Sequence, residues 1–320
     1  METADRALDD AVTAVVNGAR CAHPQWKTLH EAVPDFEHHS SRAVSFVECA
    51  TCGFVRQEPI ASVESLRDGY PADYRAHVAE DHPSMLGRAV ARLKSVQAGM
   101  LVSKLERYLP AKTEPILELG CGAGHLLRRL HQGGFTNLRG VDRNPDLGPS
   151  LRALGIAFTA CDLDEGIAAP GRYHTIIMSY VIEHLADPER VLTACAELLV
   201  PGGQVLLLTP NAASVGHRVF GRFWAGLHAP RHASLHRPST LRAMANALGF
   251  DRVEVSFPAD PGSWVLSAQN VVESRRSTGA PRFGTKWYAL ALLPFVYPFA
   301  LAESASGRGS SMLVRLIRAG

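Results

Sequence analysis

The sequence predicts an α/β protein with a mostly parallel β-sheet that is covered by helices on both faces. From residue 115 onward, short apolar runs alternate with helical stretches, which is the pattern of parallel strands joined by crossover helices. A Gly-rich segment follows the first apolar run, as in sheets that bind ligands beyond the carboxyl ends of their strands. The composition, with 46% hydrophobic and 20% charged residues, is that of an ordinary globular protein.

The predicted elements follow from these runs in chain order. Strands are expected at residues 115–120, 137–142, 156–160, 174–180, 204–209, 251–257 and 311–317. Helices are expected after the Gly-rich segment as far as residue 130, and at residues 145–154, 188–199 and 238–248. Pro238 suits the first turn of the last of these helices and Gly249 suits its end. Residues 201–203 (PGG) predict a turn.

The flanking regions predict further parts. Residues 1–18 and 84–109 carry apolar side chains at helical spacing, and Pro110 ends the second stretch. We expect an N-terminal Cys/His module over residues 1–70 and a helical linker over 71–112. A ligand-binding domain follows over residues 113–257, and a helical insertion with the last strand over 258–320.

The charge balance and the hydropathy of the chain limit the binding partners and the cellular compartment that we expect. The 33 Lys and Arg residues nearly balance the 31 Asp and Glu residues, and the formal net charge is +2. A chain so evenly charged gives no broad positive surface for nucleic acid. The first ten residues are acidic and lack the apolar core of a secretory signal. The longest apolar stretch, residues 287–301, is shorter than the ~20 residues of a membrane-spanning helix. A cytoplasmic protein is therefore expected.

The Gly-rich turn has the sequence ELGCGAGH, from Glu118 to His125. Glycines allow positive φ angles and let the backbone approach a ligand closely. The dinucleotide fingerprint G-x-G-x-x-G expects its third glycine where this chain has His125, so a nicotinamide dinucleotide fits poorly. Taken alone, the segment is also consistent with a plain turn.

Two acidic residues follow at the ends of the next two predicted strands. Asp142 lies about 20 residues after the Gly-rich turn, where a carboxylate can accept hydrogen bonds from ribose hydroxyls. Asp162 follows the third strand, where it can accept from the exocyclic amine of an adenine while Leu163 packs on the ring. Either residue alone is more often an ordinary cap or turn residue. Together they favour a nucleoside site.

These segments resemble the motifs of class I S-adenosylmethionine-dependent methyltransferases. ELGCGAG resembles the first motif, VDRNP the second, CDLDE the third, and YHTIIMSYVIEHLADPERVL the fourth with its following helix. The resemblance covers residues 113–257 and implies a Rossmann-like, seven-stranded sheet whose last strand is antiparallel. It also implies that the donor S-adenosylmethionine is bound by Glu118, Gly120, Cys121, Gly122, Gly124, Asp142, Arg143, Asp162, Leu163 and Ser179.

The later segments resemble a narrower bacterial subgroup that methylates small molecules, sugars or lipid-linked glycans. The segment GLHAPRH, with His228 where an acidic residue is often seen, carries this resemblance. Methyl transfer from a sulfonium is an in-line displacement that depends on holding acceptor and donor close together. Transfer to a hydroxyl also requires a proton acceptor, and histidine suits this role near neutral pH.

His232 and His184 are the two candidates for that proton acceptor. His184 follows the fourth predicted strand, and His228, His232 and His236 lie on the loop after the fifth. A purely structural role is the alternative for each of them. Arg231 is a candidate for pairing with an acidic group of the substrate, and Phe220, Phe223 and Trp224 are candidates for an acceptor pocket or a plain hydrophobic lid.

The N-terminal region contains half of a zinc knuckle, Cys49 and Cys52 in CATCG. The upstream half is Cys21-Ala22-His23-Pro24, in which the expected second cysteine is missing. The candidate metal ligands are Cys21, His23, Cys49 and Cys52, and a zinc held by all four would be structural. A degenerate knuckle without metal is the alternative.

Residues 258–310 are too long for a plain loop. A helical pair that packs over the mouth of the active site is one interpretation. The other is a peripheral membrane contact through residues 286–301 for a lipid-linked acceptor, because aromatic side chains there lie near Arg275, Arg276, Arg282 and Lys286.

Methyl transfer from S-adenosylmethionine to a small-molecule, sugar or lipid-linked acceptor, with oxygen as the acceptor atom, is therefore the expected function. A non-catalytic protein that binds S-adenosylmethionine is one alternative. A nucleic-acid methyltransferase is another, but the residues after the fourth strand, Ser179-Tyr180-Val181-Ile182, lack the Asn/Asp-Pro-Pro-aromatic motif of the amino-methylating enzymes.

Overall fold

The computed structural model describes residues 21, 23–37, 42–70, 92, 96, 99–274 and 287–320, with side chains in the last range from residue 292 onward. The helix predicted for residues 1–18 lies outside the described residues, as does most of the helix predicted for residues 84–109. Residues 99–105 of the latter are helical and continue into a 3₁₀ turn at Glu106–Tyr108. The basic residues Arg275, Arg276, Arg282 and Lys286 also lie outside the described part.

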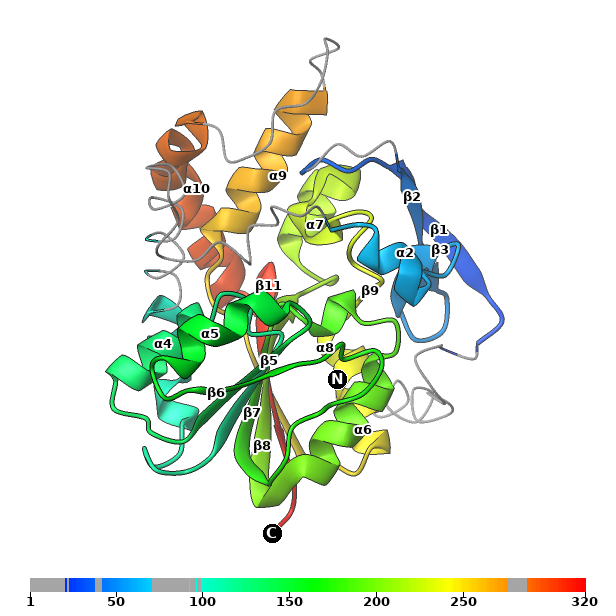
Figure 1. Cartoon of the computed structure of the whole chain (residues 1–320). Helices are drawn as coiled ribbons and strands as arrows, with labels where there is room; N and C mark the ends of the chain where they lie inside the picture. The colour runs from blue at the N-terminus through cyan, green and yellow to red at the C-terminus, as the bar shows by residue number, and fades with distance from the viewer. Residues whose placement is uncertain are drawn as a thin grey trace.

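The predicted sheet is confirmed, with seven strands in the order β10-β11-β8-β7-β4-β5-β6 (Figure 1). The strands are β4 (Ile116–Leu119), β5 (Leu138–Asp142), β6 (Ala157–Ala160), β7 (Tyr173–Ser179), β8 (Leu199–Pro210), β10 (Arg252–Ser256) and β11 (Ser311–Ile317). β11 runs antiparallel to both of its neighbours, and the other pairings are parallel. Strand β8 begins at Leu199, so the expected turn at residues 201–203 lies within its range.

Helices cover both faces of the sheet. The helices are α4 (His125–Gln132), α5 (Gly148–Arg152), α6 (Pro188–Leu198), α7 (Val215–Phe220) and α8 (Pro238–Ala247). One buried cluster joins Leu127 of α4 and Leu151 of α5 to the sheet, and another joins Leu192 of α6 and Leu241 of α8 to it. The two pairs of helices therefore pack on opposite faces. Short 3₁₀ turns lie at Pro145–Leu147, Ile182–His184, Gly221–Phe223 and Ala225–Leu227.

The N-terminal module contains a sheet that the sequence analysis did not predict. Strands β1 (Trp26–Val33), β2 (Val44–Cys49) and β3 (Val55–Glu58) pair antiparallel, and β9 (Ser234–Leu235) completes the sheet by pairing with β3. Because β9 lies far from β3 in the sequence, the pairing joins the module to the loop that carries the candidate histidines. Helix α2 (Val63–Arg67) follows β3 and lies beside the large sheet domain (Figure 1).

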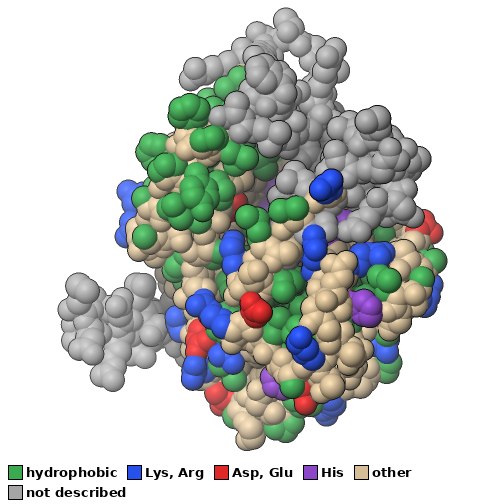
Figure 2. All heavy atoms as spheres, turned by 90° about the vertical axis from the view of Figure 1, so that its left-hand side faces the viewer, with side chains coloured by type: hydrophobic (Ala, Val, Ile, Leu, Met, Phe, Trp, Pro, Cys, Tyr) green, Lys and Arg blue, Asp and Glu red, His purple; other side chains and the backbone are tan. Residues whose placement is uncertain are grey.

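The insertion forms the predicted pair of helices, α9 (Pro261–Ser274) and α10 (Trp287–Ala305). Aromatic and aliphatic side chains on α10 face outward, with Phe295 73% exposed and Phe299 60% exposed. Figure 2 shows these hydrophobic side chains gathered over the upper part of that face. Among the described residues, none of the helices reaches the length and apolar character that crossing a bilayer requires.

Candidate active site

A cavity of about 1570 Å³ lies beyond the carboxyl ends of the parallel strands. Its wall includes nine of the ten residues predicted to bind the methyl donor, namely Glu118, Gly120, Cys121, Gly122, Asp142, Arg143, Asp162, Leu163 and Ser179. The tenth, Gly124, lies at the N-cap of α4. The candidate catalytic residues His184 and His232 line the same cavity. Residues from the beginning, the middle and the end of the chain thus share one pocket.

Glycine is required in the loop between β4 and α4. Gly120 has φ +66° and Gly124 has φ +72°, values that other L-residues rarely adopt. A Cβ atom at Gly120 would lie 2.5 Å from Val181 Cγ2, and one at Gly124 would lie 2.4 Å from Leu151 Cδ2. The loop can therefore lie close to the start of the helix and to a ligand only because these positions have no side chain.

Two buried carboxyl groups stand behind this loop. Asp142 accepts from the backbone N–H of Gly122 at 2.9 Å and from that of Asn144 at 3.0 Å. Glu118 is buried, and its Oε2 has no hydrogen-bond partner among the described residues. Burial and the nearby Asp142 raise the pKa of Glu118 well above its usual range. A cationic ligand with donor groups would satisfy this unpaired oxygen, so the residues present fit an amino-acid nucleoside such as S-adenosylmethionine.

Asp162 has a partner that the sequence analysis missed. Arg67 of α2 donates to Asp162 Oδ2 at 2.9 Å and also pairs with Glu165 at 2.6 Å. Tyr70, three residues further on, lies against Arg143, with the guanidinium carbon 4.3 Å from its ring centroid. The end of the N-terminal module thus borders the predicted adenine site. No periodicity or motif in residues 63–70 signals this contact.

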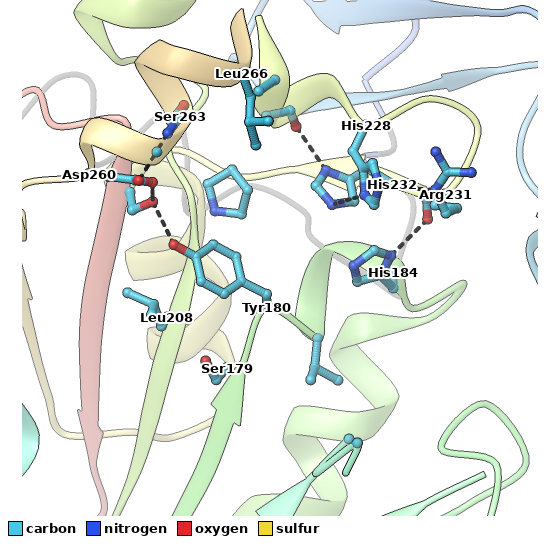
Figure 3. Close-up of a pocket in the computed structure, with 18 of the residues that line it drawn as sticks. Ser179, Tyr180, His184, Leu208, His228, Arg231, His232, Asp260, Ser263 and Leu266 are labelled. Carbon is cyan, nitrogen blue, oxygen red and sulfur yellow. Dashed lines mark hydrogen bonds between the residues drawn. The ribbon is translucent and has the colours of Figure 1, made fainter. Parts of the chain in front are cut away.

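Three histidines meet on one side of the cavity (Figure 3). The ring centroids of His184 and His232 lie 4.5 Å apart, and those of His228 and His232 lie 4.8 Å apart. His184 Nδ1 lies 3.1 Å from the Arg231 carbonyl oxygen, and His232 Nδ1 lies 2.8 Å from that of Gly226. The predicted pair is therefore brought together, with His228 as a third member.

The imidazoles of His184 and His232 are neutral near pH 7. Burial, followed by the neighbouring His228, lowers the pKa of His184 to about 3. Burial and the neighbouring His184 lower the pKa of His232 well below its usual range. Neutral imidazoles keep one lone pair each, which can accept a proton or bind a metal. His236 is buried and is not among the residues that line the cavity.

Glu183 lies directly behind His232. This residue is fully buried; its Oε2 accepts from Thr209 Oγ1 at 3.0 Å, and its Oε1 has no hydrogen-bond partner among the described residues. Oε1 lies 3.9 Å from His232 Nε2. Burial raises the pKa of Glu183 to about 8. The sequence analysis treated this residue only as the neighbour of His184, and the structure makes it part of the same cluster.

The N-terminal module holds the histidine loop in place. Gln57 of β3 donates to the carbonyl oxygens of Pro230 and His232, each at 2.7 Å. Arg231 is fully buried and donates to Asp35 Oδ1 at 2.6 Å. The prediction that Arg231 pairs with an acidic substrate group is therefore wrong, because Asp35 of the module already provides its carboxylate. Glu37 contacts His228 Nε2.

On the opposite wall, Tyr180 directly follows strand β7 and has φ +56°, a strained value for an aromatic residue. Its hydroxyl lies 2.9 Å from Ser311 Oγ, which donates to Asp260 Oδ2 at 2.5 Å. Figure 3 shows Tyr180 and Asp260 across the pocket from the histidines. Trp224, one of the predicted aromatic residues, lines the cavity, whereas Phe220 and Phe223 are not part of its wall.

The four predicted metal ligands come together at a separate place, at the start of β1 and the end of β2. Cys21 Sγ lies 3.3 Å from Cys49 Sγ and 3.4 Å from Cys52 Sγ. His23 Nδ1 lies 2.9 Å from Cys21 Sγ. Although burial raises the pKa of Cys49, hydrogen bonds from the backbone of Cys52 and Thr51 and from Cys21 lower it to about 6. The set can hold a tetrahedral ion such as Zn²⁺.

Fold and site together define a class I S-adenosylmethionine-dependent methyltransferase, and comparison with known proteins agrees. A family described as a methyltransferase domain matches residues 93–255, just over half of the chain. The protein belongs to this family and is an S-adenosylmethionine-dependent methyltransferase.

Two O-methyltransferases and one solved structure are among the proteins that are similar to this chain. The chain is 31% identical over 166 residues to the ubiquinone biosynthesis O-methyltransferase of Ralstonia nicotianae, covering 47% of this chain and 68% of that protein. The enzyme of the same name from Cereibacter sphaeroides is 29% identical over 182 residues, covering 52% of this chain and 73% of that protein. A methyltransferase structure from Archaeoglobus fulgidus aligns with a TM-score of 0.44 and 19% identity, covering 69% of this chain and 94% of that one.

Proposed function

We propose that this enzyme transfers a methyl group from S-adenosylmethionine to a hydroxyl oxygen of a small molecule that has an apolar part. The observation that carries the proposal is the shared cavity, in which the predicted donor residues and a cluster of three histidines face one space. The names of the relatives, which are O-methyltransferases, support oxygen as the acceptor atom.

The donor residues have distinct proposed roles. The loop at Gly120 and Gly122 holds the methionine part, and Glu118 balances its ammonium group. Asp142 accepts from the ribose hydroxyls, and Asp162 accepts from the adenine amine. Cys121, Gly124, Arg143, Leu163 and Ser179 complete this part of the site. When bound, S-adenosylmethionine supplies an electrophilic methyl group on a positively charged sulfur.

His232 is the proposed proton acceptor, and His184 holds it in place. His232 Nδ1–H donates to the Gly226 carbonyl oxygen, so the lone pair lies on Nε2. Glu183 Oε1, 3.9 Å from this atom, would stabilise the imidazolium that forms when the acceptor loses its proton. General-base assistance of this kind contributes about 10²–10⁴-fold to a rate.

The shape of the cavity supports an acceptor with an extended apolar part. Leu266 of α9 and Leu293 and Tyr297 of α10 line it on the side away from the donor loop. The exposed aromatic face of α10 continues this apolar surface outward. A lipid-linked hydroxyl compound fits this arrangement, with its tail between the two helices and a peripheral membrane contact at residues 286–301.

We also propose that Cys21, His23, Cys49 and Cys52 hold a structural zinc ion. Four protein ligands leave no open position for substrate. The ion would connect the start of β1 to the end of β2, and so fix the module that supports the histidine loop.

The test is methyl transfer from S-adenosylmethionine carrying a labelled methyl group. The acceptors are an aromatic diol with an apolar tail, the same diol without the tail, and matched compounds with an amine or a carboxylate in place of the hydroxyl. We expect label on the diols and faster transfer to the tailed one. Transfer to the amine or the carboxylate alone would contradict the proposal. An exposed histidine variant on α4, His131→Asn, serves as the control.

A further inference from the structure

The histidine cluster has the geometry of a metal site as well as that of a proton acceptor. One ring nitrogen from each of His184, His228 and His232 lies within 4.8 Å of the others. His228 Nδ1 and His232 Nε2 lie 3.3 Å apart, close to the ~3.3 Å between two nitrogens that each bind a tetrahedral ion at ~2.0–2.1 Å. We propose that His184, His228 and His232 bind a divalent transition-metal cation of the Zn²⁺ and Co²⁺ class.

Two of the three imidazoles are oriented by backbone carbonyl groups. His232 Nδ1–H donates to the Gly226 carbonyl oxygen, which leaves Nε2 of this ring as the ligand atom. His184 Nδ1 lies 3.1 Å from the Arg231 carbonyl oxygen and 2.7 Å from the Tyr70 hydroxyl, so Nε2 is the nitrogen of His184 that remains for a ligand. Metal-binding histidines usually donate their second N–H to a carbonyl or carboxylate in this way. In Figure 3 the second nitrogen of His184 points into the cavity. Nε2 of the third ring, His228, contacts Glu37 and also lies 3.0 Å from Arg231 Nε, so Nδ1 is the nitrogen of this ring that faces His232.

The surroundings of the cluster favour a cation. Glu183 is fully buried, and its Oε1, without a hydrogen-bond partner in the described structure, lies 3.9 Å from His232 Nε2. An unpaired buried carboxyl group is costly unless something compensates it, and a nearby divalent ion would do so. The positive charge of Arg231 is compensated by Asp35, at 2.6 Å.

The inference rests on the proposed function and changes the role of His232 from free base to ligand. Three protein ligands leave a fourth position open, as in catalytic metal sites. The acceptor hydroxyl would occupy it, facing the donor loop across the same cavity. Its O–H bond would break, and the proton would pass to water in the cavity. The electron pair of the oxygen would then form the bond to the methyl carbon, while the carbon–sulfur bond breaks and its electrons stay on sulfur.

The experiment is a titration of the metal-free full-length enzyme with Co²⁺, followed by visible absorption. Wild type is compared with His228→Asn, Glu37→Gln and the control His131→Asn. We expect His228→Asn to lose the cobalt spectrum of a nitrogen site, with at least ~100-fold weaker binding at that site. Glu37→Gln, which removes only the support of His228, should weaken binding by about 10–100-fold. Cobalt at the cysteines gives thiolate charge-transfer bands and is unchanged in all four proteins.

Equal cobalt uptake and identical spectra in wild type and His228→Asn would overturn the inference. Should His228→Asn fail to fold, judged by circular dichroism, Glu37→Gln decides, because Glu37 is partly exposed and its change is nearly isosteric. If the proposed function is wrong, no hydroxyl compound is methylated, while the cobalt spectra still respond to the two variants. Methylation that persists after chelation, with unchanged spectra, contradicts the metal site alone.

Discussion

The two ends of the cavity are built in different ways. The donor end takes its residues from the ends of successive strands of the large sheet, within residues 118–179. The acceptor end is assembled from segments that lie far apart in the sequence, including Glu37, Tyr70, His184, His232 and Asp260. The donor end can therefore be inferred from local sequence, whereas the acceptor end depends on how the N-terminal module and the last helices dock. Substitutions at the donor end and at the acceptor end should therefore have different effects.

The largest effect is expected from the paired substitution Cys49→Ser and Cys52→Ser. A structural zinc contributes folding free energy on the order of 10 kcal/mol in small domains, and the core of the module is small and shared with residues 212–235. Loss of the zinc ion should release Gln57 from the carbonyl groups of Pro230 and His232. Misplacement of reacting groups by about 1 Å costs about 10²-fold, so transfer should fall at least that far.

Donor binding should survive the same change. We expect the affinity for S-adenosylmethionine, measured by titration calorimetry, to stay within about threefold, because the residues proposed to bind it follow strands of the large sheet and surface contacts from the module contribute little. Metal analysis should show about one zinc fewer per chain. Cys161→Ser, outside the cluster, is the control and keeps its zinc. Normal methyl transfer by the doubly substituted protein would show that the acceptor end does not depend on the N-terminal module.

The opposite result is expected for Asp142→Ala. This carboxylate supports Gly122 and Asn144, and the proposed ribose contacts are charge-assisted hydrogen bonds of about 1.5–3 kcal/mol. Donor affinity should fall by about 100-fold in calorimetry, while cobalt binding at the histidines stays as in wild type. Asp146→Ala, at an exposed position shortly after strand β5, serves as the matched control. An unchanged donor affinity would remove Asp142 from the site.

The large sheet could be predicted because each of its strands carries a local signal. Apolar runs such as residues 138–142 are followed by polar turns and helical periodicity, and every strand of the sheet was expected within a few residues of its true bounds, apart from the early start of β8 at Leu199. The N-terminal sheet was missed because burial along β1 does not alternate regularly and its register with β2 is broken. Its fourth strand, β9, has only two residues and comes from elsewhere in the chain.

The same reasoning explains which site residues were found. Gly120, Asp142 and Asp162 have fixed positions relative to strand ends, so sequence spacing is enough to bring them together. Arg67, Tyr70 and Glu37 reach the cavity only through the docking of the module. Arg231 was misinterpreted for the same reason, because its partner Asp35 lies 196 residues earlier in the chain.

A third prediction concerns the loop that shapes the donor end. Gly120→Ala adds a methyl group 2.5 Å from Val181 Cγ2, and a β-branched side chain cannot easily turn away. Gly155 also has a positive φ, +77°, but nothing lies within 4 Å of the place that a Cβ atom would take there, so Gly155→Ala measures backbone strain alone. We expect Gly120→Ala to lower the free energy of unfolding by about 1–3 kcal/mol more than Gly155→Ala, measured in urea. Equal losses would show that the close approach to Val181 does not constrain the loop.

The smallest expected effect is on donor affinity and concerns Arg67, which connects the N-terminal module to the donor end of the cavity. Arg67 is 40% exposed and pairs with Asp162 and Glu165. Exposed ion pairs contribute about 0–1 kcal/mol and are screened by salt. We therefore expect Arg67→Ala to change donor affinity by less than about fivefold, with the difference shrinking as salt is raised in the calorimeter. Asp162→Ala removes the proposed adenine contact itself and should cost more than about tenfold. If Arg67→Ala weakens donor binding as much as Asp162→Ala, the module is part of the donor end, and the division between a local donor site and an assembled acceptor site no longer holds.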